Sequence, residues 1–202
     1  MARKAKIDAE VTRSNLLDAA EMIFFQKGVT RTTLEEIAKA ANVTRGALYW
    51  HFQNKSDILA AMYAQAAPPI EEMASEVLGK ENAITAIKNY WLCALKDLHK
   101  NEHICRIVDI LLRKCESLED MESISENTNQ WMRSSLAIME QAFVEAKTQK
   151  ILSEDIDPRL ATLSLFGMIT GLIYMWLRMP SFFDLDREIQ KILDQYFDTL
   201  SR

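Results

Sequence analysis

The sequence predicts an all-α fold of about nine helices. Only five of the 202 residues are Gly and four are Pro, whereas the helix-favouring residues Leu, Ala, Met, Glu and Lys are abundant. Apolar residues recur at helical spacing in successive segments, and no segment alternates as a strand would. With 49% hydrophobic and 26% charged residues, the chain has the composition of a globular protein with a substantial core.

The first predicted helix covers residues 8–27. Gly28 follows its last apolar position and is expected to end it, because glycine readily adopts the left-handed conformation found after helices. The expected core-facing residues are Leu16, Leu17, Ala20, Ile23 and Phe24.

Two short helices joined by a tight turn are predicted between Thr33 and Phe52. Thr33 and Glu36 have the spacing of a capping box, so a helix should begin at Leu34. Asn42 is expected to end that helix, and Thr44 to cap a second one that starts at the next residue. The connection of about three residues is typical of a helix-turn-helix.

The exposed side chains of the second short helix suit contact with DNA. Arg45 offers a planar guanidinium for a guanine edge or a phosphate, and Gly46 permits a close approach. Tyr49, Trp50 and His51 carry hydrogen-bonding groups that can contact phosphate oxygens. The alternative is that these aromatic residues cap the core of another kind of helical hairpin.

The charge distribution supports a nucleic-acid partner for the N-terminal part. Residues 1–55 hold nine Lys or Arg against six Asp or Glu, a balance of +3, and residues 56–202 hold 15 against 23, a balance of -8. Lys55 lies within a second predicted capping box, Asn54 to Asp57, and so is near a helix N-terminus that favours anions. The basic residues Arg3, Lys4 and Lys6 are expected to form a flexible arm along DNA or a solubilising tail.

The segment T-T-L-E-E-I-A-K-A-A-N-V-T-R-G-A-L-Y-W-H-F-Q-N-K-S-D-I-L closely resembles the DNA-binding signature of the TetR family of bacterial transcriptional regulators, and the likeness extends back through Arg3 to Gly28. It implies an N-terminal helix-turn-helix domain, residues 1–54, and a C-terminal helical ligand-binding and dimerisation domain, residues 55–202. The residues expected to serve DNA binding are Thr33, Thr44, Arg45, Gly46, Tyr49, Trp50, His51 and Lys55.

The fourth predicted helix runs from Lys55 to the pair Pro68–Pro69. These prolines either kink it, which would matter for a link between the two domains, or end it so that another helix begins at Ile70. Further helices are expected near residues 83–100, 103–115 and, after an acidic break at 116–122, 123–150.

Leu160–Leu177 is eighteen residues without a charge. It has the length of a membrane span, but its Thr and Ser residues and the absence of a second span favour a helix buried on nearly every side. Pro180 should end this segment, and an amphipathic helix is expected over residues 186–200. In TetR-like proteins the equivalent pair forms a four-helix bundle with a twofold mate, which implies a homodimer. Gly167 and Gly171 would permit close approach.

Two further segments, residues 107–117 and 166–185, resemble the TetR subgroup that represses multidrug efflux operons of the resistance-nodulation-division type. This implies a repressor that binds a near-palindromic operator as a dimer and is released by small hydrophobic or cationic ligands. The alternative functions are a regulator of a metabolic or stress operon that responds to another signal, and a helical interaction protein without a DNA role. The ligand-binding residues implied by the resemblance are Tyr63, Ala67, Ile70, Tyr90, Val108, Leu112, Ser135, Met139, Phe166 and Ile169, each of which is alternatively plain core.

Other chemistry finds little support. Asp109 is expected either to contact cationic ligands or to form a solvent-facing salt bridge. His99, His103 and Cys105 have metal-ligand spacing but lack a fourth ligand, so no metal and no cofactor are expected. Three cysteines, an odd number, are expected to be reduced in a cytoplasmic protein, and the N-terminus lacks the apolar segment of a secretory signal. No phosphate loop, nucleophile elbow or catalytic carboxylate pair is present, so no enzyme is predicted.

Overall fold

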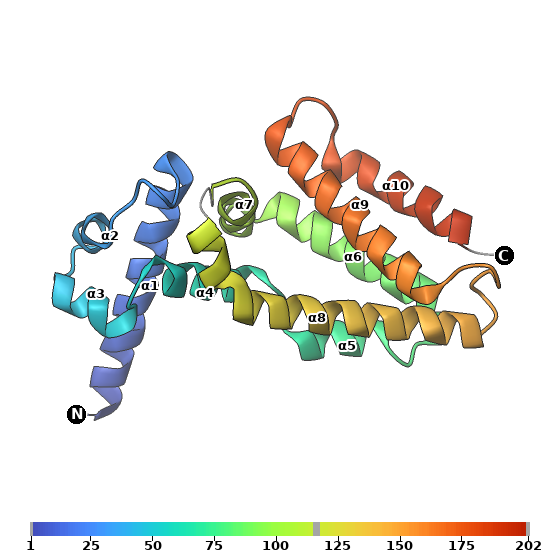
Figure 1. Cartoon of the computed structure of the whole chain (residues 1–202), viewed down its shortest axis with the longest axis horizontal. Helices are drawn as coiled ribbons and strands as arrows, with labels where there is room; N and C mark the ends of the chain where they lie inside the picture. The colour runs from blue at the N-terminus through green and yellow to red at the C-terminus, as the bar shows by residue number, and fades with distance from the viewer. Residues whose placement is uncertain (1, 115–117, 201–202) are drawn as a thin grey trace. The chain divides into compact units, whose positions relative to one another are not determined.

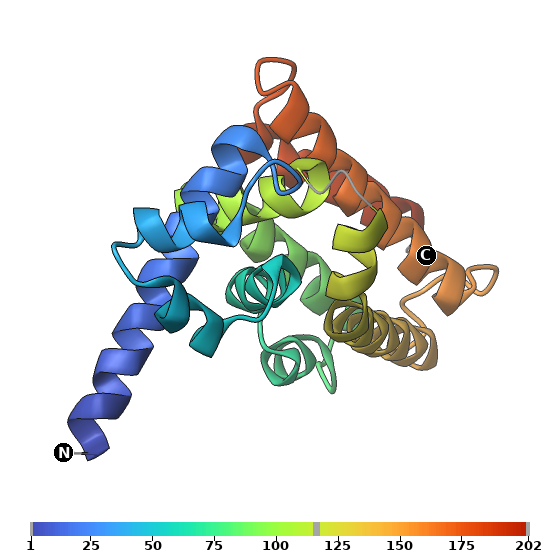
Figure 2. The same ribbon diagram turned by 60° about the vertical axis from the view of Figure 1, so that its left-hand side comes forward.

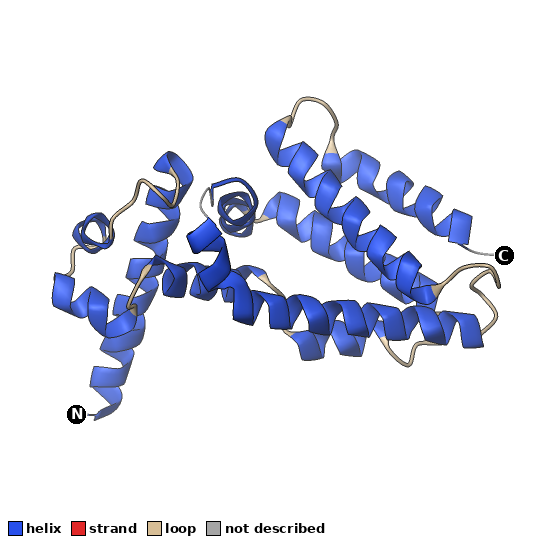
Figure 3. Ribbon diagram, viewed as in Figure 1, coloured by secondary structure: helices blue, strands red, loops and turns tan. Residues whose placement is uncertain are grey.

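The computed structural model describes residues 2–114 and 118–200, and within them every element is helical (Figures 1 and 3). The all-α prediction is therefore confirmed. The elements are α1 (Ala2–Lys27), α2 (Leu34–Ala40), α3 (Arg45–His51), α4 (Lys55–Ala66), α5 (Ile70–Val77), α6 (Ala83–Lys100), α7 (Glu102–Asp109), a π-helical segment η1 (Ile110–Lys114), α8 (Leu118–Thr148), α9 (Pro158–Arg178) and α10 (Leu185–Leu200).

The chain packs as two compact units. The head unit comprises Met1–Ala67 and His103–Asn129, and the body unit comprises Pro68–Glu102 and Gln130–Arg202. These are packing units, so the functional boundary placed between residues 54 and 55 remains a prediction.

The head unit is built on α1, against which α2, α4 and η1 pack. α2 and α3 also pack against each other, which closes the helix-turn-helix. Four of the five residues predicted to face the core from the first helix are buried in it, and Ile23 is partly buried against it. The core residues are Leu16, Leu17, Ala20, Phe24, Val29, Ile37, Ala38, Leu48, Phe52, Ile58, Leu59, Met62, Ile107 and Ile110.

Two predictions for the head unit need correction. α1 begins at Ala2, so the backbone expected to form a flexible basic arm is helical. The reason is that residues 2–7 contain no Gly or Pro, and Ala, Arg and Lys all favour helix.

At α4, Asn54 Oδ1 accepts from the Asp57 backbone N–H at 2.9 Å, but Asp57 Oδ2 accepts from Gln53 N–H. The second capping box is therefore only half formed.

The proline pair separates two helices. α4 ends at Ala66, and α5 begins at Ile70 with Pro69 as its N-cap. Because neither proline has an N–H to donate, the chain restarts a helix instead of continuing one. The alternative of an ending and a new start is confirmed.

In the body unit α10 packs on α6, and α9 and α10 lie side by side in both views (Figures 1 and 2). Tyr196 donates its hydroxyl to Ala161 O at 2.9 Å, and Lys88 Nζ pairs with Asp194 Oδ1 at 2.9 Å. The buried face of α10 consists of Leu185, Ile189, Leu193, Phe197 and Leu200. The amphipathic helix predicted over residues 186–200 is confirmed.

α8 starts at Leu118, so part of the predicted acidic break is helical. Residues 115–117, with Cys115, lie outside the described residues.

The prediction that residues 160–177 form a helix buried on nearly every side is wrong. Only 22% of the apolar window of α9 is buried, although the helix is long and apolar enough to cross a membrane by length and composition. Leu160 and Leu163 are 63% and 47% exposed, and Tyr174 and Met175 are exposed with them. We call these four residues the α9 face.

Candidate DNA-binding surface and ligand groove

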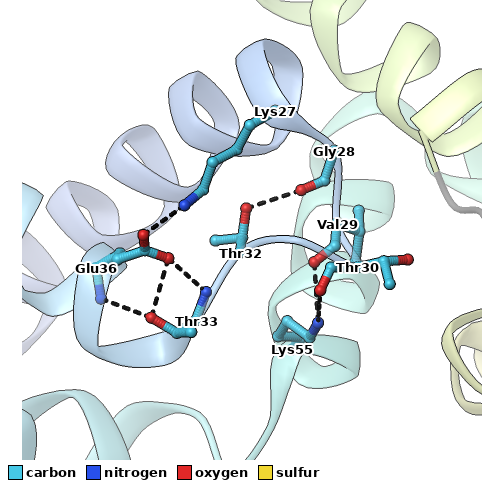
Figure 4. Close-up of polar contacts among 8 residues, drawn as sticks. All are labelled: Lys27, Gly28, Val29, Thr30, Thr32, Thr33, Glu36 and Lys55. Atoms are coloured by element: carbon cyan, nitrogen blue, oxygen red, sulfur yellow. Dashed lines mark hydrogen bonds and ion pairs between the residues drawn. The ribbon is translucent and has the colours of Figure 1, made fainter.

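The N-terminus of α2 is fixed by the predicted capping box (Figure 4). Thr33 Oγ1 accepts from Glu36 N–H at 3.2 Å, and Glu36 Oε2 accepts from Thr33 N–H at 2.8 Å. The Lys27 ammonium lies 2.5 Å from Glu36 Oε1. The Lys27 contact first, and then the Thr33 hydrogen bonds, lower the pKa of Glu36 to about 2. Glu36 is therefore ionised at neutral pH, and α1 and α2 are joined at this point.

The turn between α2 and α3 has the predicted geometry. Asn42 adopts a left-handed conformation with φ 55°, which lets the chain reverse without a glycine. Val43 N–H then donates to Ala38 O at 3.0 Å. Thr44 caps α3, with Oγ1 accepting from Ala47 N–H at 3.1 Å. Both short helices therefore have defined starts, which fixes the direction in which α3 presents its side chains.

α3 has one buried and one exposed face. Leu48 is buried, and Phe52, the residue that ends the helix, is buried beside it. The Arg13 guanidinium of α1 lies 5.2 Å from the centre of the Phe52 ring. On the other side Trp50 is 72% exposed. An indole exposed to this extent is accessible to the backbone of a DNA duplex.

Arg45 is held by two neighbours that the sequence did not indicate. Its Nη1 lies 2.5 Å from Glu35 Oε1, and its guanidinium carbon lies 5.4 Å from the centre of the Tyr49 ring. The Tyr49 hydrogen bond and then the Glu35 carboxylate raise the pKa of the guanidinium above its usual value. A methyl group added at Gly46 would meet Thr44 Oγ1 only at 3.9 Å, so the protein itself leaves room there.

His51 is half-buried at the end of α3. Burial, and secondly the positive charge of Arg13, lower the pKa of its imidazole below the usual value. Trp50 packs edge-on against it, with ring centroids 4.5 Å apart. Both effects favour the neutral imidazole, which can offer a phosphate one N–H donor.

Lys55 has a structural contact in addition to its predicted role. Its ammonium donates to Val29 O at 2.9 Å and lies 3.4 Å from Thr30 O (Figure 4). Thr32 Oγ1 donates to Gly28 O at 2.8 Å in the same loop. Lys55 thus ties α4 to the α1–α2 loop, and its contact with DNA remains a prediction.

The ten predicted ligand residues are divided between the two units. Tyr63, Ala67, Val108 and Leu112 belong to the head unit, and the other six belong to the body unit. Ser135, Met139 and Ile169 are buried, and Ser135 Oγ donates to Trp131 O at 2.9 Å within α8. Phe166 packs edge-on against Trp91, with ring centroids 5.2 Å apart. Whether these residues contact a ligand remains a prediction.

The body unit contains a groove of about 580 Å³ that runs from Pro68 and α5 to α6. Tyr90 is the one of the ten predicted ligand residues that lines it among the residues described. Its other lining residues are Pro68, Glu72, Glu76, Lys80, Asn82, Thr85, Ala86, Asn89, Cys93, Ala94 and Asp97. Burial, and secondly the Glu72 charge, raise the pKa of Tyr90 above its usual value.

Contacts with α8 hold α5 beside this groove. Trp131 Nε1 donates to Pro68 O at 3.0 Å at one end of α5. At the other end Glu145 Oε2 accepts from Gly79 N–H at 2.8 Å. The groove therefore has a fixed wall, and its three carboxylates outnumber its single ammonium. An aromatic ring beside excess negative charge suits an amphipathic cation.

The other two predictions about charged or metal-ligating groups resolve differently. Asp109 is 2% exposed and forms an ion pair through Oδ1 with Arg113 Nε, so its salt bridge is buried and does not face solvent. Glu21 is also buried and pairs with both His103 and Arg106. The His99 ring packs against Trp176 with centroids 5.5 Å apart. The two histidines thus have separate protein contacts.

Comparison with known proteins identifies the family. Residues 16–62 match the model of bacterial regulatory proteins of the tetR family, and residues 82–202 match the C-terminal region of MAATS-type transcriptional repressors. The chain is 34% identical to the HTH-type transcriptional regulator AcrR of Shigella flexneri over 190 residues, covering 93% of this chain and 88% of that one.

Solved structures agree with this assignment. The crystal structure of NalD, the secondary repressor of the MexAB-OprM multidrug efflux pump in Pseudomonas aeruginosa, is 36% identical with a TM-score of 0.90, covering 96% of this chain and 98% of that one. The SmeT–triclosan complex, whose protein represses the Stenotrophomonas maltophilia pump SmeDEF, is 29% identical with a TM-score of 0.82, covering 95% and 92%. The chain therefore belongs to the TetR family of bacterial transcriptional regulators.

Proposed function

We propose that the chain is a ligand-responsive repressor of a multidrug efflux operon, acting in the cytoplasm as a homodimer on a near-palindromic operator. The observation that carries the proposal is the exposed face of α3, which two capped helix starts hold in a defined direction. The efflux assignment is supported by relatives that are named as repressors of multidrug pumps.

On DNA, the residues of α3 take different roles. Arg45 and Gly46 lie at the start of the helix and approach base edges, while Tyr49, Trp50 and His51 contact phosphates. Thr33, Thr44 and Lys55 lie at the starts of α2, α3 and α4. There, backbone N–H groups that are not used within the helices favour phosphate oxygens.

The last two helices form the dimer interface. The α9 face is apolar and exposed in the single chain, so burying it against a second copy removes that surface from water. At Gly167 and Gly171 an added methyl group would meet nothing within 4 Å, so two chains can approach closely there. A twofold pair places two α3 helices about 34 Å apart, one turn of DNA.

The effector binds in the body. The α5–α6 groove offers Tyr90 for an aromatic or cationic group, with Glu72, Glu76 and Asp97 to balance a positive charge. A ligand that binds more tightly to the DNA-free state shifts the population towards it and releases the operator. Pro68 and Pro69 interrupt the helix between α4 and α5, and a conformational change in the body is transmitted to the head through this segment.

Fluorescence anisotropy tests the proposal with the duplex that lies upstream of the protein's own gene and a random duplex of equal length. The protein should prefer the upstream duplex, and tetraphenylphosphonium or triclosan should weaken that binding. Arg45→Ala should reduce the preference for the upstream duplex, whereas Tyr49→Phe should lower the affinity for both duplexes by a similar factor. Equal affinity for the two duplexes would contradict a repressor of the adjacent genes.

A further inference from the structure

The ion pair between Glu35 and Arg45 has a consequence for sequence recognition. Glu35 lies in the first turn of α2, and Arg45 is the first residue of α3. Their side chains meet across the turn with 2.5 Å between Oε1 and Nη1, and both are 65% exposed. Tyr49 lies beneath the guanidinium. Glu35 and Tyr49 therefore orient the Arg45 side chain, which is expected to contact bases, in the DNA-free protein.

Glu35 has no other hydrogen bond or ion pair among those found in the described structure, whereas its neighbour Glu36 completes the capping box and pairs with Lys27. The Glu35 carboxylate therefore acts mainly on Arg45. It brings a negative charge to the start of the helix expected to face phosphates, and this charge opposes binding to any DNA sequence.

The pair changes what Arg45 offers to DNA. A guanidinium has five N–H donors, and the Glu35 contact occupies a donor on Nη1. Its net charge is balanced by the carboxylate, so its attraction for phosphates anywhere on a duplex is reduced. After the Glu35 and Tyr49 contacts three N–H donors of the guanidinium remain, and two parallel N–H groups are what the O6 and N7 atoms of guanine accept.

We propose that Glu35 is a specificity-determining residue, which balances the charge of Arg45 while leaving its donors available to read a guanine edge. The proposal rests on the DNA-binding function above. Specificity is a difference between two affinities, and Glu35 increases it by weakening the unwanted complex. A phosphate contact loses most of its charge attraction, whereas a guanine contact keeps its two directed hydrogen bonds.

The test is Glu35→Gln, which keeps the shape of the side chain and removes its charge. Affinity for a random duplex should rise about two- to fivefold, the range of one exposed ion pair, and affinity for the operator duplex should rise less. The ratio of operator to random affinity should therefore fall. The slope of log K against log salt on random DNA should steepen by up to about 0.9, one added phosphate contact.

Two matched measurements make the result specific to the pair. In an Arg45→Ala background, Glu35→Gln should leave the affinity ratio unchanged, because the guanidinium it acts on is gone. Asp18→Asn, which removes an exposed charge from α1, should not change the ratio either. Thermal melts of each variant check that the head stays folded.

An unchanged ratio for Glu35→Gln, or the same fall of the ratio in the Arg45→Ala background, would overturn the proposal. Failure of the underlying function looks different, because the unmodified protein would then show no preference between the two duplexes.

Discussion

The head and the body of this chain differ in the range of the contacts that build their sites. In the head, the contacts that fix the start of α2 and orient Arg45 join close neighbours: Thr33 and Glu36 are three positions apart in the sequence, and Glu35 and Arg45 are ten positions apart. In the body, the contact between Trp131 and Pro68 that fixes the groove spans 63 residues. A site built from local contacts can be recognised from a short motif, whereas one built from distant contacts cannot.

The comparison also separates two kinds of polar group. The Glu36 carboxylate, at the protein surface, accepts from Thr33 N–H at the start of α2 and pairs with Lys27 of α1. The groove instead carries Glu72 and Glu76 on α5 and Asp97 on α6, with Lys80 as the single ammonium. The first arrangement stabilises a surface for recognition, and the second leaves negative charge unbalanced for a ligand.

The largest expected effect concerns the head core. Phe52→Ala should lower the free energy of unfolding by about 3–5 kcal/mol, because the ring is buried beside Leu48 and its removal leaves a cavity. Operator binding should be lost with it. Phe182→Ala is the control, since that ring is 72% exposed and its loss should cost less than about 0.5 kcal/mol. Urea unfolding measures the free energy of unfolding of both variants. Equal losses for the two variants would contradict the contribution of the buried Phe52 ring to the head core.

The second prediction contrasts two residues of the body. Tyr90→Ala should weaken binding of tetraphenylphosphonium about five- to thirtyfold, because the ring lines the groove. It should cost less stability than Met139→Ala, because the Tyr90 ring is only partly buried. Met139→Ala should instead lower stability by about 2–5 kcal/mol, since that side chain is fully buried. Calorimetric titration and urea unfolding distinguish them, and an exchange of the two outcomes would place the ligand elsewhere.

The third prediction compares two helix caps. Thr44→Ala and Asn82→Ala each remove a side chain that accepts an N–H at a helix start, so each should cost about 1 kcal/mol of stability. Only Thr44→Ala should also weaken operator binding, because it caps the helix that we propose contacts DNA. Equal operator affinities for the two variants would show that the start of α3 is not part of the DNA surface.

The smallest effect is the acid sensitivity of the α2 cap. Its contacts lower the folded-state pKa of Glu36 from 4.5 to about 2, so its contribution is complete above about pH 4.5 and is lost as the pH falls towards 2. The stability difference between the parent protein and Glu36→Gln should shrink over that window. Urea unfolding at several pH values measures it, and a constant difference would mean that the charge of Glu36 contributes nothing.

Sequence reasoning located the helix starts at Thr33 and Thr44 and the left-handed Asn42, because each depends on a few neighbouring residues. It missed Glu35 and Arg13, whose roles depend on how separate helices pack. The exposure of the α9 face was also missed, since composition alone does not tell a buried helix from one that awaits a partner.

The pocket shows the same limit more strongly. A family resemblance named ten ligand residues, and the groove along α5 and α6 includes Tyr90 but is otherwise lined by residues that no motif marked. Its position depends on Trp131 and Glu145, which hold α5 from a distant helix. Such contacts have no signature in a single sequence.

The most direct test of the whole account is calorimetric titration of tetraphenylphosphonium into the protein, with and without saturating operator. If effector binding and operator release are coupled, the operator must weaken ligand binding by the same factor by which the ligand weakens operator binding. The account predicts a higher Kd for the ligand in the presence of operator, matched by that reciprocal factor. An equal Kd in both titrations would contradict it.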